Sequence, residues 1–108
     1  MAIVMNLTYT GENGSALAFV EEMESSGVAP AIRAEAGNLR YDYYQSLSHP
    51  ETVLLIDAWA DQASLDAHHA TPMMGQIMAL REKHALRMTA ERYVPQEANA
   101  ADERFLRK

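Results

Sequence analysis

Gly37–Pro72, GNLRYDYYQSLSHPETVLLIDAWADQASLDAHHATP, is the stretch that decides the fold. It contains two segments, 38–46 and 52–60, that are rich in the β-branched and aromatic residues typical of strands. Pro50 lies between them, and proline fixes φ and has no N–H to donate to a sheet, so this position favours a turn. The stretch therefore predicts a β-hairpin.

A helix is expected directly after this hairpin. Asp61 can cap its first turn, just after the lone Trp59 that ends the second strand, and the helix carries His68 and His69. Neighbouring side chains point about 100° apart around a helix, so only one of these imidazoles can face a given pocket. A proline then interrupts the helix, and apolar residues at helical spacing predict that it resumes over 73–84.

The upstream part of the chain predicts a strand followed by two helical pieces. Residues 2–10 alternate with period two, and the apolar members of one face are Ile3, Met5, Leu7 and Tyr9. Ser15 is a suitable N-cap for a helix whose apolar residues recur at i, i+3, i+4 and i+7. A second helical piece is expected over 31–36, started by Pro30 and ended by Gly37.

With a last strand at 85–94, the order becomes β-α-β-β-α-β, the split pattern of ferredoxin-like α+β folds. It predicts an antiparallel four-stranded sheet with helices on one face, formed by residues 1–94. The uncovered face is expected to pack against a second copy, giving a homodimer. The polar tail, 95–108, contains Phe105 and Leu106, with which it could dock on the partner subunit or else fray.

The composition narrows the function classes. The chain has 108 residues, a formal net charge of −6 and no cysteine. The charge argues against nucleic acid and anionic membrane as partners, and no apolar run approaches the ~20 residues of a membrane span. Without cysteine or a signal peptide, a cytoplasmic protein is expected. Its four histidines lack the carboxylate spacing of a metal motif, so no metal site is predicted.

The segments GNLRYDYY, HPET, LLIDAW and LDAHHATP resemble the antibiotic biosynthesis monooxygenase domain, a group of dimeric α/β barrels that includes small quinol monooxygenases. The resemblance covers about residues 2–94 and is densest over 38–72. It implies cofactor-free oxygenation of a small electron-rich aromatic, such as a quinol, by O₂. Ground-state O₂ is a triplet, so the substrate must give up an electron readily, and deprotonation makes it able to do so. The protein then needs an apolar pocket, a base and hydrogen-bond donors.

His68 and Asn6 are the residues expected to do this chemistry. His68 occupies the place of a histidine common in the family, and imidazole has a suitable pKa for a general base; the alternative is a structural or surface histidine. Asn6 is an amide on an apolar strand and could donate to a substrate oxygen or to O₂, or else hydrogen-bond within the sheet. A pocket between these two side chains is expected.

Four more residues are assigned to the pocket that holds the aromatic ring. Trp59 matches the strand-end tryptophan of the family, where core closure is given more weight than ligand stacking. Tyr43 comes from the tyrosine-rich strand, and Met73 and Ile77 come from the helix after the proline. Methionine either packs the core or forms an adaptable wall around a flat ligand.

The sequence also departs from the family pattern. Many relatives have a histidine where Met73 stands, and some quinone-forming relatives have Asn and Tyr where this chain has Leu55 and Leu65. Haem-degrading relatives need a Trp and a His at the places of His68 and Met78, so haem cleavage is not expected. Two alternatives to an oxygenase stay open: an isomerase or tautomerase of a small oxygenated metabolite, and a non-catalytic ligand-binding dimer.

Overall fold

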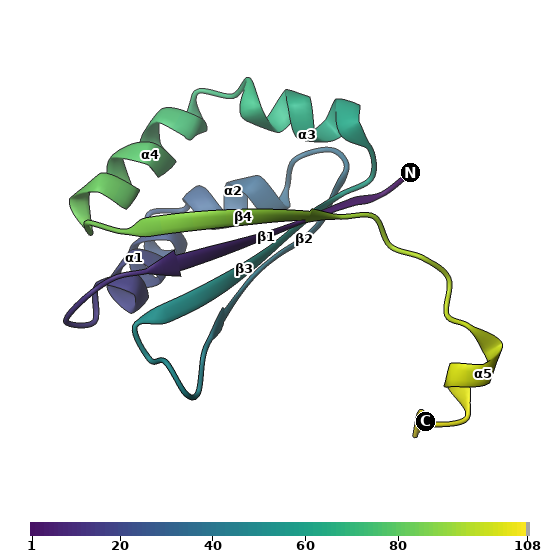
Figure 1. The fold of residues 1–108 in the computed structure, drawn as a ribbon. Coiled ribbons are helices and arrows are strands. Elements are labelled where there is room, and N and C mark those ends of the chain that lie inside the picture. Colours follow the sequence, from purple (N-terminus) through teal and green to yellow (C-terminus); the bar gives the residue numbers. More distant parts are fainter. Residues whose placement is uncertain (108) are drawn as a thin grey trace.

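The computed structural model describes residues 1–107 and contains a four-stranded antiparallel sheet with strand order β2-β3-β1-β4. In chain order the elements are β1 (Ile3–Thr10), α1 (Ser15–Ser25), α2 (Val28–Arg33), β2 (Asn38–Gln45), β3 (Thr52–Trp59), α3 (Gln62–His69), α4 (Met73–Lys83), β4 (Arg87–Tyr93) and α5 (Ala100–Glu103). The arrangement of helices and strands is drawn in Figure 1. The predicted ferredoxin-like order is confirmed, with each of its two helical regions split into two helices.

The core lies between the sheet and the four helices α1 to α4. Strands β1 and β3 pair so that Leu7 lies opposite Leu55 and Ile3 opposite Trp59, and all four side chains are buried. The helices add the buried residues Phe19, Met23, Ile32, Leu65 and Ile77 to the same cluster. Burying one such side chain contributes about 1.5–3 kcal/mol, so this one-sided core holds the helices on one face of the sheet.

The first two helices begin differently from the prediction. Helix α1 starts at Ser15 itself, with Gly14 as its N-cap, and the Ser15 hydroxyl accepts a hydrogen bond within the preceding turn. Helix α2 covers Val28–Arg33 rather than 31–36, because the turn at Gly27 already reverses the chain. Proline in the first turn of a helix is tolerated since no N–H is needed there, so the proline did not mark the first residue.

A β-bulge at the start of β2 changes which face Leu39 occupies. The register of β2 against β3 shifts between Asn38 and Arg40. Leu39 is 60% exposed, whereas Tyr41 is buried and faces the helices. Strict alternation along residues 38–46 predicts that Leu39 and Tyr41 share a face, and this is wrong because a bulge inserts one residue and breaks the alternation of the strand.

Arg33 ties the first two helices to the edge of the sheet. Its Nε donates a 2.8 Å hydrogen bond to the backbone carbonyl of Tyr41 in β2. Its two terminal nitrogens donate to the two carboxylate oxygens of Glu24 in α1, at 2.7 and 2.6 Å. A bidentate fork of this kind fixes direction as well as distance, so α1, α2 and β2 are held in one geometry.

Gly37 is required because α3 approaches the turn before β2 closely. Its φ is +81°, and an added Cβ would lie 2.1 Å from Ser64 Oγ. Gly37→Ala is therefore expected to lower the free energy of unfolding by about 1–3 kcal/mol. Gly75→Ala is the matched control, since a Cβ in α4 meets nothing within 4 Å, and it is expected to raise stability by about 0.5–1 kcal/mol. Chemical denaturation measures both; equal stability of Gly37→Ala and wild type would contradict the argument.

The sheet face opposite the helices is apolar at its centre and uncovered. Its middle strands present Val4, Leu54 and Ile56, which are partly buried within the single chain, and Ala58, which is buried. This is the face expected to meet a second copy.

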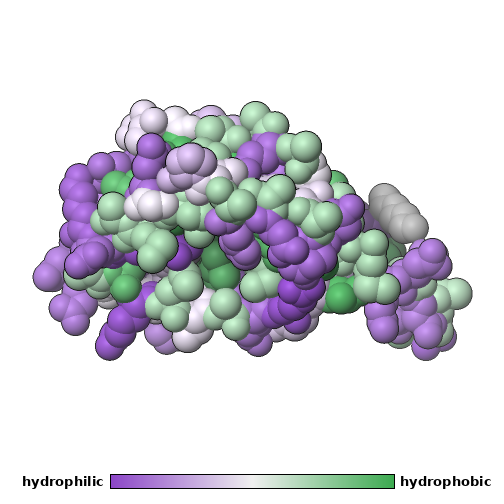
Figure 2. All heavy atoms as spheres, turned by 90° about the horizontal axis from the view of Figure 1, so that it is seen from above, coloured by the Kyte–Doolittle hydropathy of each residue, from purple (hydrophilic) through white to green (hydrophobic). Residues whose placement is uncertain are grey.

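The C-terminal segment leaves the body after β4. Figure 1 shows it extending to α5, and Figure 2, seen from above, shows it projecting at one end while polar and apolar residues intermix over the body. Phe105 is 74% exposed and Leu106 58% exposed. Docking of this tail on a partner subunit stays a prediction. None of the helices described is long and apolar enough to cross a membrane.

Candidate functional site

His68 lies buried on the inner face of α3 and is paired with a carboxylate. Its Nδ1 is 2.7 Å from Oε2 of Glu35, which precedes β2. The His68 side chain is 4% exposed and that of Glu35 17%. When a carboxylate accepts the hydrogen bond from Nδ1–H, Nε2 keeps its lone pair and can take up a proton. The dyad thus presents a proton acceptor where little water reaches it.

Trp59 forms one wall of the His68 site. The two rings are stacked with centroids 4.7 Å apart and an interplanar angle of 25°. The indole Nε1 donates a 2.6 Å hydrogen bond to Oδ1 of Asp57. Since Asp57 and Trp59 are two residues apart on β3, both side chains point toward the helices. Trp59 is fully buried, so it closes the core and at the same time contacts the imidazole.

Burial raises the pKa of the Asp57 carboxyl to about 6, against the opposing effect of the Trp59 hydrogen bond. The side chain is almost wholly removed from water, and lost solvation disfavours the charged form. Asp57 and Glu35 therefore flank the stacked Trp59–His68 pair with two carboxyl groups. Buried titratable groups with perturbed pKa values gather at functional sites, which makes this part of the interior the candidate site.

The raised pKa of Asp57 predicts that stability falls as pH rises from about 4 to about 6. In this window the folded protein keeps a proton that the unfolded chain, with a pKa near 3.8, has released. Stability is full below the window, and about 3 kcal/mol is lost above it. The unfolding free energy of wild type minus that of Asp57→Asn should show this fall, with exposed Asp66→Asn as control. A difference that does not change with pH would contradict it.

Tyr9, which is buried, and Arg81, which is partly buried, each have one buried atom with unused hydrogen-bonding capacity. The Tyr9 hydroxyl and Arg81 Nε have no partner of acceptable geometry among residues 1–107. The Arg81 guanidinium, from α4, lies over the Tyr9 ring with Cζ 5.5 Å from the centroid. Burial raises the pKa of Tyr9, and the Arg81 cation partly offsets this. A buried donor without a partner costs about 1–3 kcal/mol, so a water or a ligand oxygen bound at this pair would remove that cost.

Tyr43 and Tyr41 line the same side of the sheet as His68. Tyr43 donates to the Tyr41 hydroxyl at 3.3 Å, and their rings meet edge to face with centroids 5.6 Å apart. Burial raises the pKa of both phenols well above the ordinary value. Both are therefore neutral at physiological pH and can act as donors but not as bases.

Asn6 lies on the other side of the sheet from His68. On β1, Leu7 faces the helices, whereas Asn6 lies opposite Ile56 and Glu91 on the uncovered face. The expected pocket between Asn6 and His68 is wrong, because the period-two alternation of the strand puts the sheet between them. Asn6 Oδ1 is buried and finds no hydrogen-bond partner in the described part of the chain.

Met73 and Ile77 are both placed in the interior by α4. Ile77 is 1% exposed and belongs to the same core cluster as Trp59, and Met73 is partly buried against that cluster. His69 is exposed although its ring centroid is 5.6 Å from that of His68. Trp59, Tyr43, Met73 and Ile77 thus lie on the same side of the sheet as His68, and Asn6 lies on the other side. That these four residues line a pocket stays a prediction.

Sequence reasoning missed four members of this site: Asp57, Glu35, Tyr9 and Arg81. Asp57 could have been found from the sequence, because it is the one carboxyl in an apolar strand and lies two residues before Trp59. Residues two apart on a strand lie on the same face, so Asp57 shares the buried face with Trp59. Tyr9 was placed on the right face but read as core. Glu35 and Arg81 gave no signal, since their contacts join elements far apart in the chain.

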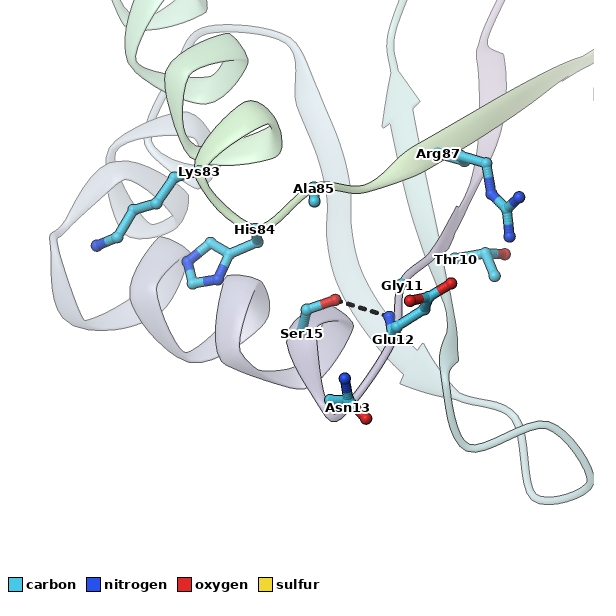
Figure 3. A pocket seen from close by; sticks show the side chains of 9 residues that line it. All are labelled: Thr10, Gly11, Glu12, Asn13, Ser15, Lys83, His84, Ala85 and Arg87. Atoms are coloured by element: carbon cyan, nitrogen blue, oxygen red, sulfur yellow. Dashed lines mark hydrogen bonds between the residues drawn. The ribbon is translucent and has the colours of Figure 1, made fainter.

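A surface hollow of about 520 Å³ lies away from these residues. It is formed by the end of β1, the loop to α1 and the connection from α4 to β4 (Figure 3). A smaller hollow of about 290 Å³ is lined by β1 and β4. His84 in the larger hollow is already bonded to Glu22 at 2.8 Å, and none of the buried unpartnered atoms found in residues 1–107 lines either hollow. Nor do three His, Cys, Asp or Glu side chains of this range gather as a metal site.

Comparison with known proteins gives a consistent family match. The model of the antibiotic biosynthesis monooxygenase family matches residues 1–80. A candidate monooxygenase of Bacillus subtilis, YcnE, is 29% identical over 48 residues, which are 44% of this chain and 50% of that protein. That match therefore spans only half the length of the relative.

Solved structures share the fold over nearly the whole domain. A candidate antibiotic biosynthesis monooxygenase from Deinococcus radiodurans has a TM-score of 0.78 at 21% identity, covering 90% of this chain and 95% of that one. SnoaB, a cofactor-independent oxygenase from Streptomyces nogalater, has a TM-score of 0.73 at 12% identity, covering 92% and 97%. At these identities the likeness establishes the fold alone.

Proposed function

Because this chain belongs to the antibiotic biosynthesis monooxygenase family, we propose that it is a cofactor-independent monooxygenase that oxidises a small electron-rich aromatic, such as a quinol. The observation that carries the proposal is the buried His68–Glu35 pair beside Trp59 and Asp57. SnoaB, described as a cofactor-independent oxygenase, shows that this fold can carry out such a reaction.

The reaction needs a base and no bound electron carrier. Removing a phenolic proton gives an electron-rich anion that can pass an electron to O₂. For a hydroquinone, one oxygen atom of O₂ becomes bonded to a ring carbon and the other leaves as water. The substrate itself supplies the two electrons and two hydrogens that turn the second oxygen atom into water. The balanced reaction is therefore hydroquinone plus O₂ giving hydroxyquinone plus water.

His68 is the proton acceptor in this proposal. Its Nδ1 is engaged by Glu35 at 2.7 Å, which leaves Nε2 for the substrate hydroxyl. The carboxylate orients the ring and stabilises the imidazolium that forms. A base held this way contributes on the order of 10²–10⁴-fold to the rate.

Arg81 and Tyr9 replace Asn6 as the donors that hold the substrate oxygen. Both have hydrogen-bonding atoms that are buried and unmet by any other residue described, and the arginine adds a positive charge. Donors fixed in advance around a developing anion act strongly where water is excluded. Met73, which packs against the core from α4, has a flexible side chain that can give way to a flat ring.

Oxygen consumption with a panel of hydroquinones and anthrones tests the proposal. We expect catalysed O₂ uptake by the purified protein, and under ¹⁸O₂ one labelled atom in the product. Turnover of the same compounds without O₂, with exchange of a carbon-bound proton, would instead support the isomerase. Tight binding with neither reaction would support a ligand-binding dimer and overturn the oxygenase.

We further propose that the protein works as a homodimer paired through the uncovered sheet face. Two observations support this: the apolar Leu54 and Ile56 remain uncovered there, and Asn6 Oδ1 is a buried acceptor for which residues 1–107 of one chain supply no donor. A second sheet packed on this face would bury the apolar side chains and bring donors toward the amide.

A charge on this face should separate the subunits. Ile56→Asp is expected to raise the dimer dissociation constant by on the order of 100-fold, because two carboxylates would be buried per dimer. Light scattering after size exclusion measures the mass. Met78→Asp, at a 60% exposed position on α4, is the matched control and should leave the dimer intact. A wild-type monomer, or a dimeric Ile56→Asp, would refute this interface.

A further inference from the structure

On β3, Asp57 is linked to the proposed base His68 through the indole ring of Trp59. Asp57 Oδ1 accepts the Trp59 indole N–H at 2.6 Å, and the face of that indole stacks on His68 at 4.7 Å. Core packing already confines the buried ring, and a bond at its edge adds a directional constraint on the ring plane. The position of the imidazole over the sheet therefore depends on a carboxyl whose hydrogen bond goes to the indole and not to the imidazole.

We propose that Asp57 is a positioning residue for the base: through Trp59 it fixes the plane on which His68 rests, and its ionised form adds negative charge beside the imidazolium. The catalytic part of this proposal rests on the proposed function, and the geometric part does not. Asp57 accepts a hydrogen bond from the edge of Trp59, whereas Glu35 contacts His68 directly through Nδ1. Two carboxyl groups, one on β3 and one in the turn before β2, thus hold the base.

The groups packed around Asp57 determine whether its carboxyl is charged near neutral pH. The pKa of its carboxyl is raised by the charge of Glu35 and lowered by those of His68 and Arg81. The Asp57 charge in turn raises the pKa values of Tyr9 and Tyr41 on the neighbouring strands. Desolvation by these packed elements is the largest influence and favours the neutral form, while the positive groups oppose it. Small changes in pH near 6 therefore change the charge next to the base.

The chain offers a direct probe, because Trp59 is its only tryptophan and gives one indole N–H resonance. In ¹H–¹⁵N spectra of ¹⁵N-labelled full-length protein, we expect this resonance to lie downfield and to move with a midpoint near pH 6. The movement should persist in His68→Gln and vanish in Asp57→Asn. Asp66→Asn, on the exposed face of α3, is the control and should titrate like wild type.

A second variant separates position from charge. Asp57→Asn keeps an oxygen that accepts the hydrogen bond from the indole, so its kcat should fall by only about 10-fold. Asp57→Leu removes this acceptor, so its kcat should fall by on the order of 100-fold, while its KM should stay within about 3-fold of wild type. Both variants are compared at pH 7.5 after thermal unfolding has shown that they are folded. If Asp57→Leu does not fold, the two Asp57→Asn measurements decide.

The outcomes distinguish this inference from the function on which it rests. An indole resonance that titrates unchanged in Asp57→Asn, or a kcat unchanged in the folded Asp57 variants, overturns the positioning role even if the wild type consumes O₂. The expected spectra in a protein that consumes no O₂ with any quinol would support the geometric role of Asp57 and overturn the oxygenase.

Discussion

Replacing His68 with glutamine is expected to lower kcat for oxygen consumption by on the order of 10²–10⁴-fold, because the proton acceptor is lost while the side chain keeps a similar length. The imidazole is 4% exposed and bonded to Glu35 at 2.7 Å, and His68 is the one histidine that is buried among residues 1–107. The measurement is initial O₂ uptake at saturating quinol, on protein whose thermal unfolding matches that of the wild type.

His69→Gln is the control for that experiment. His69 follows on the same helix, but its side chain is exposed. Partial burial of its ring lowers its pKa. Its kcat should stay within about 3-fold of wild type. Equal losses in the two variants would mean that the helix, and not the buried base, matters; full activity in His68→Gln would remove His68 from the mechanism.

Trp59→Ala is expected to cause the largest loss of stability, about 3–5 kcal/mol in the free energy of unfolding. The ring is fully buried against the core cluster, and truncation leaves a cavity that the surrounding sheet and helices fill only in part. It also removes the donor to Asp57, so the carboxyl is buried without its 2.6 Å partner.

Two further variants apportion that loss by chemical denaturation. Trp59→Phe keeps most of the ring but not the N–H, so its loss of stability should be smaller than that of Trp59→Ala. Phe105→Ala removes an aromatic side chain that is 74% exposed, and it should change stability by less than about 0.5 kcal/mol. A Trp59→Ala protein within 1 kcal/mol of wild type would contradict the packing described for β3.

The layout of the fold followed from local patterns in the sequence. Alternation in 2–10 and the apolar run at 52–60 give the central pair of strands, and the cap at Asp61 is present, with its carboxylate accepting from the Ser64 N–H at 2.8 Å. The departures arise where one residue changes the register, as at the bulge that turns Leu39 outward. A bulge leaves no periodic signature, so its position could not be read from the pattern.

The site was predictable only where one element carried it. His68 and Trp59 were singled out from their own segments, and the structure stacks them. Asn6 was assigned to the wrong side because its chemistry was weighed before its parity on the strand, although Leu7 and Tyr9 already marked the core face. Glu35 and Arg81 reach the site through tertiary contacts, which spacing along the chain does not encode.

The link from Arg33 to the backbone of Tyr41 has a consequence for how these molecules behave at high concentration. β2 is an outer strand, and strands at the rim of a sheet tend to recruit strands from other molecules. The Arg33 guanidinium, which also pairs with Glu24, occupies the Tyr41 carbonyl and places a bulky ion pair along that rim. Uncontrolled strand addition is thereby discouraged at β2, which leaves the β4 rim as the more open one for joining chains edge to edge.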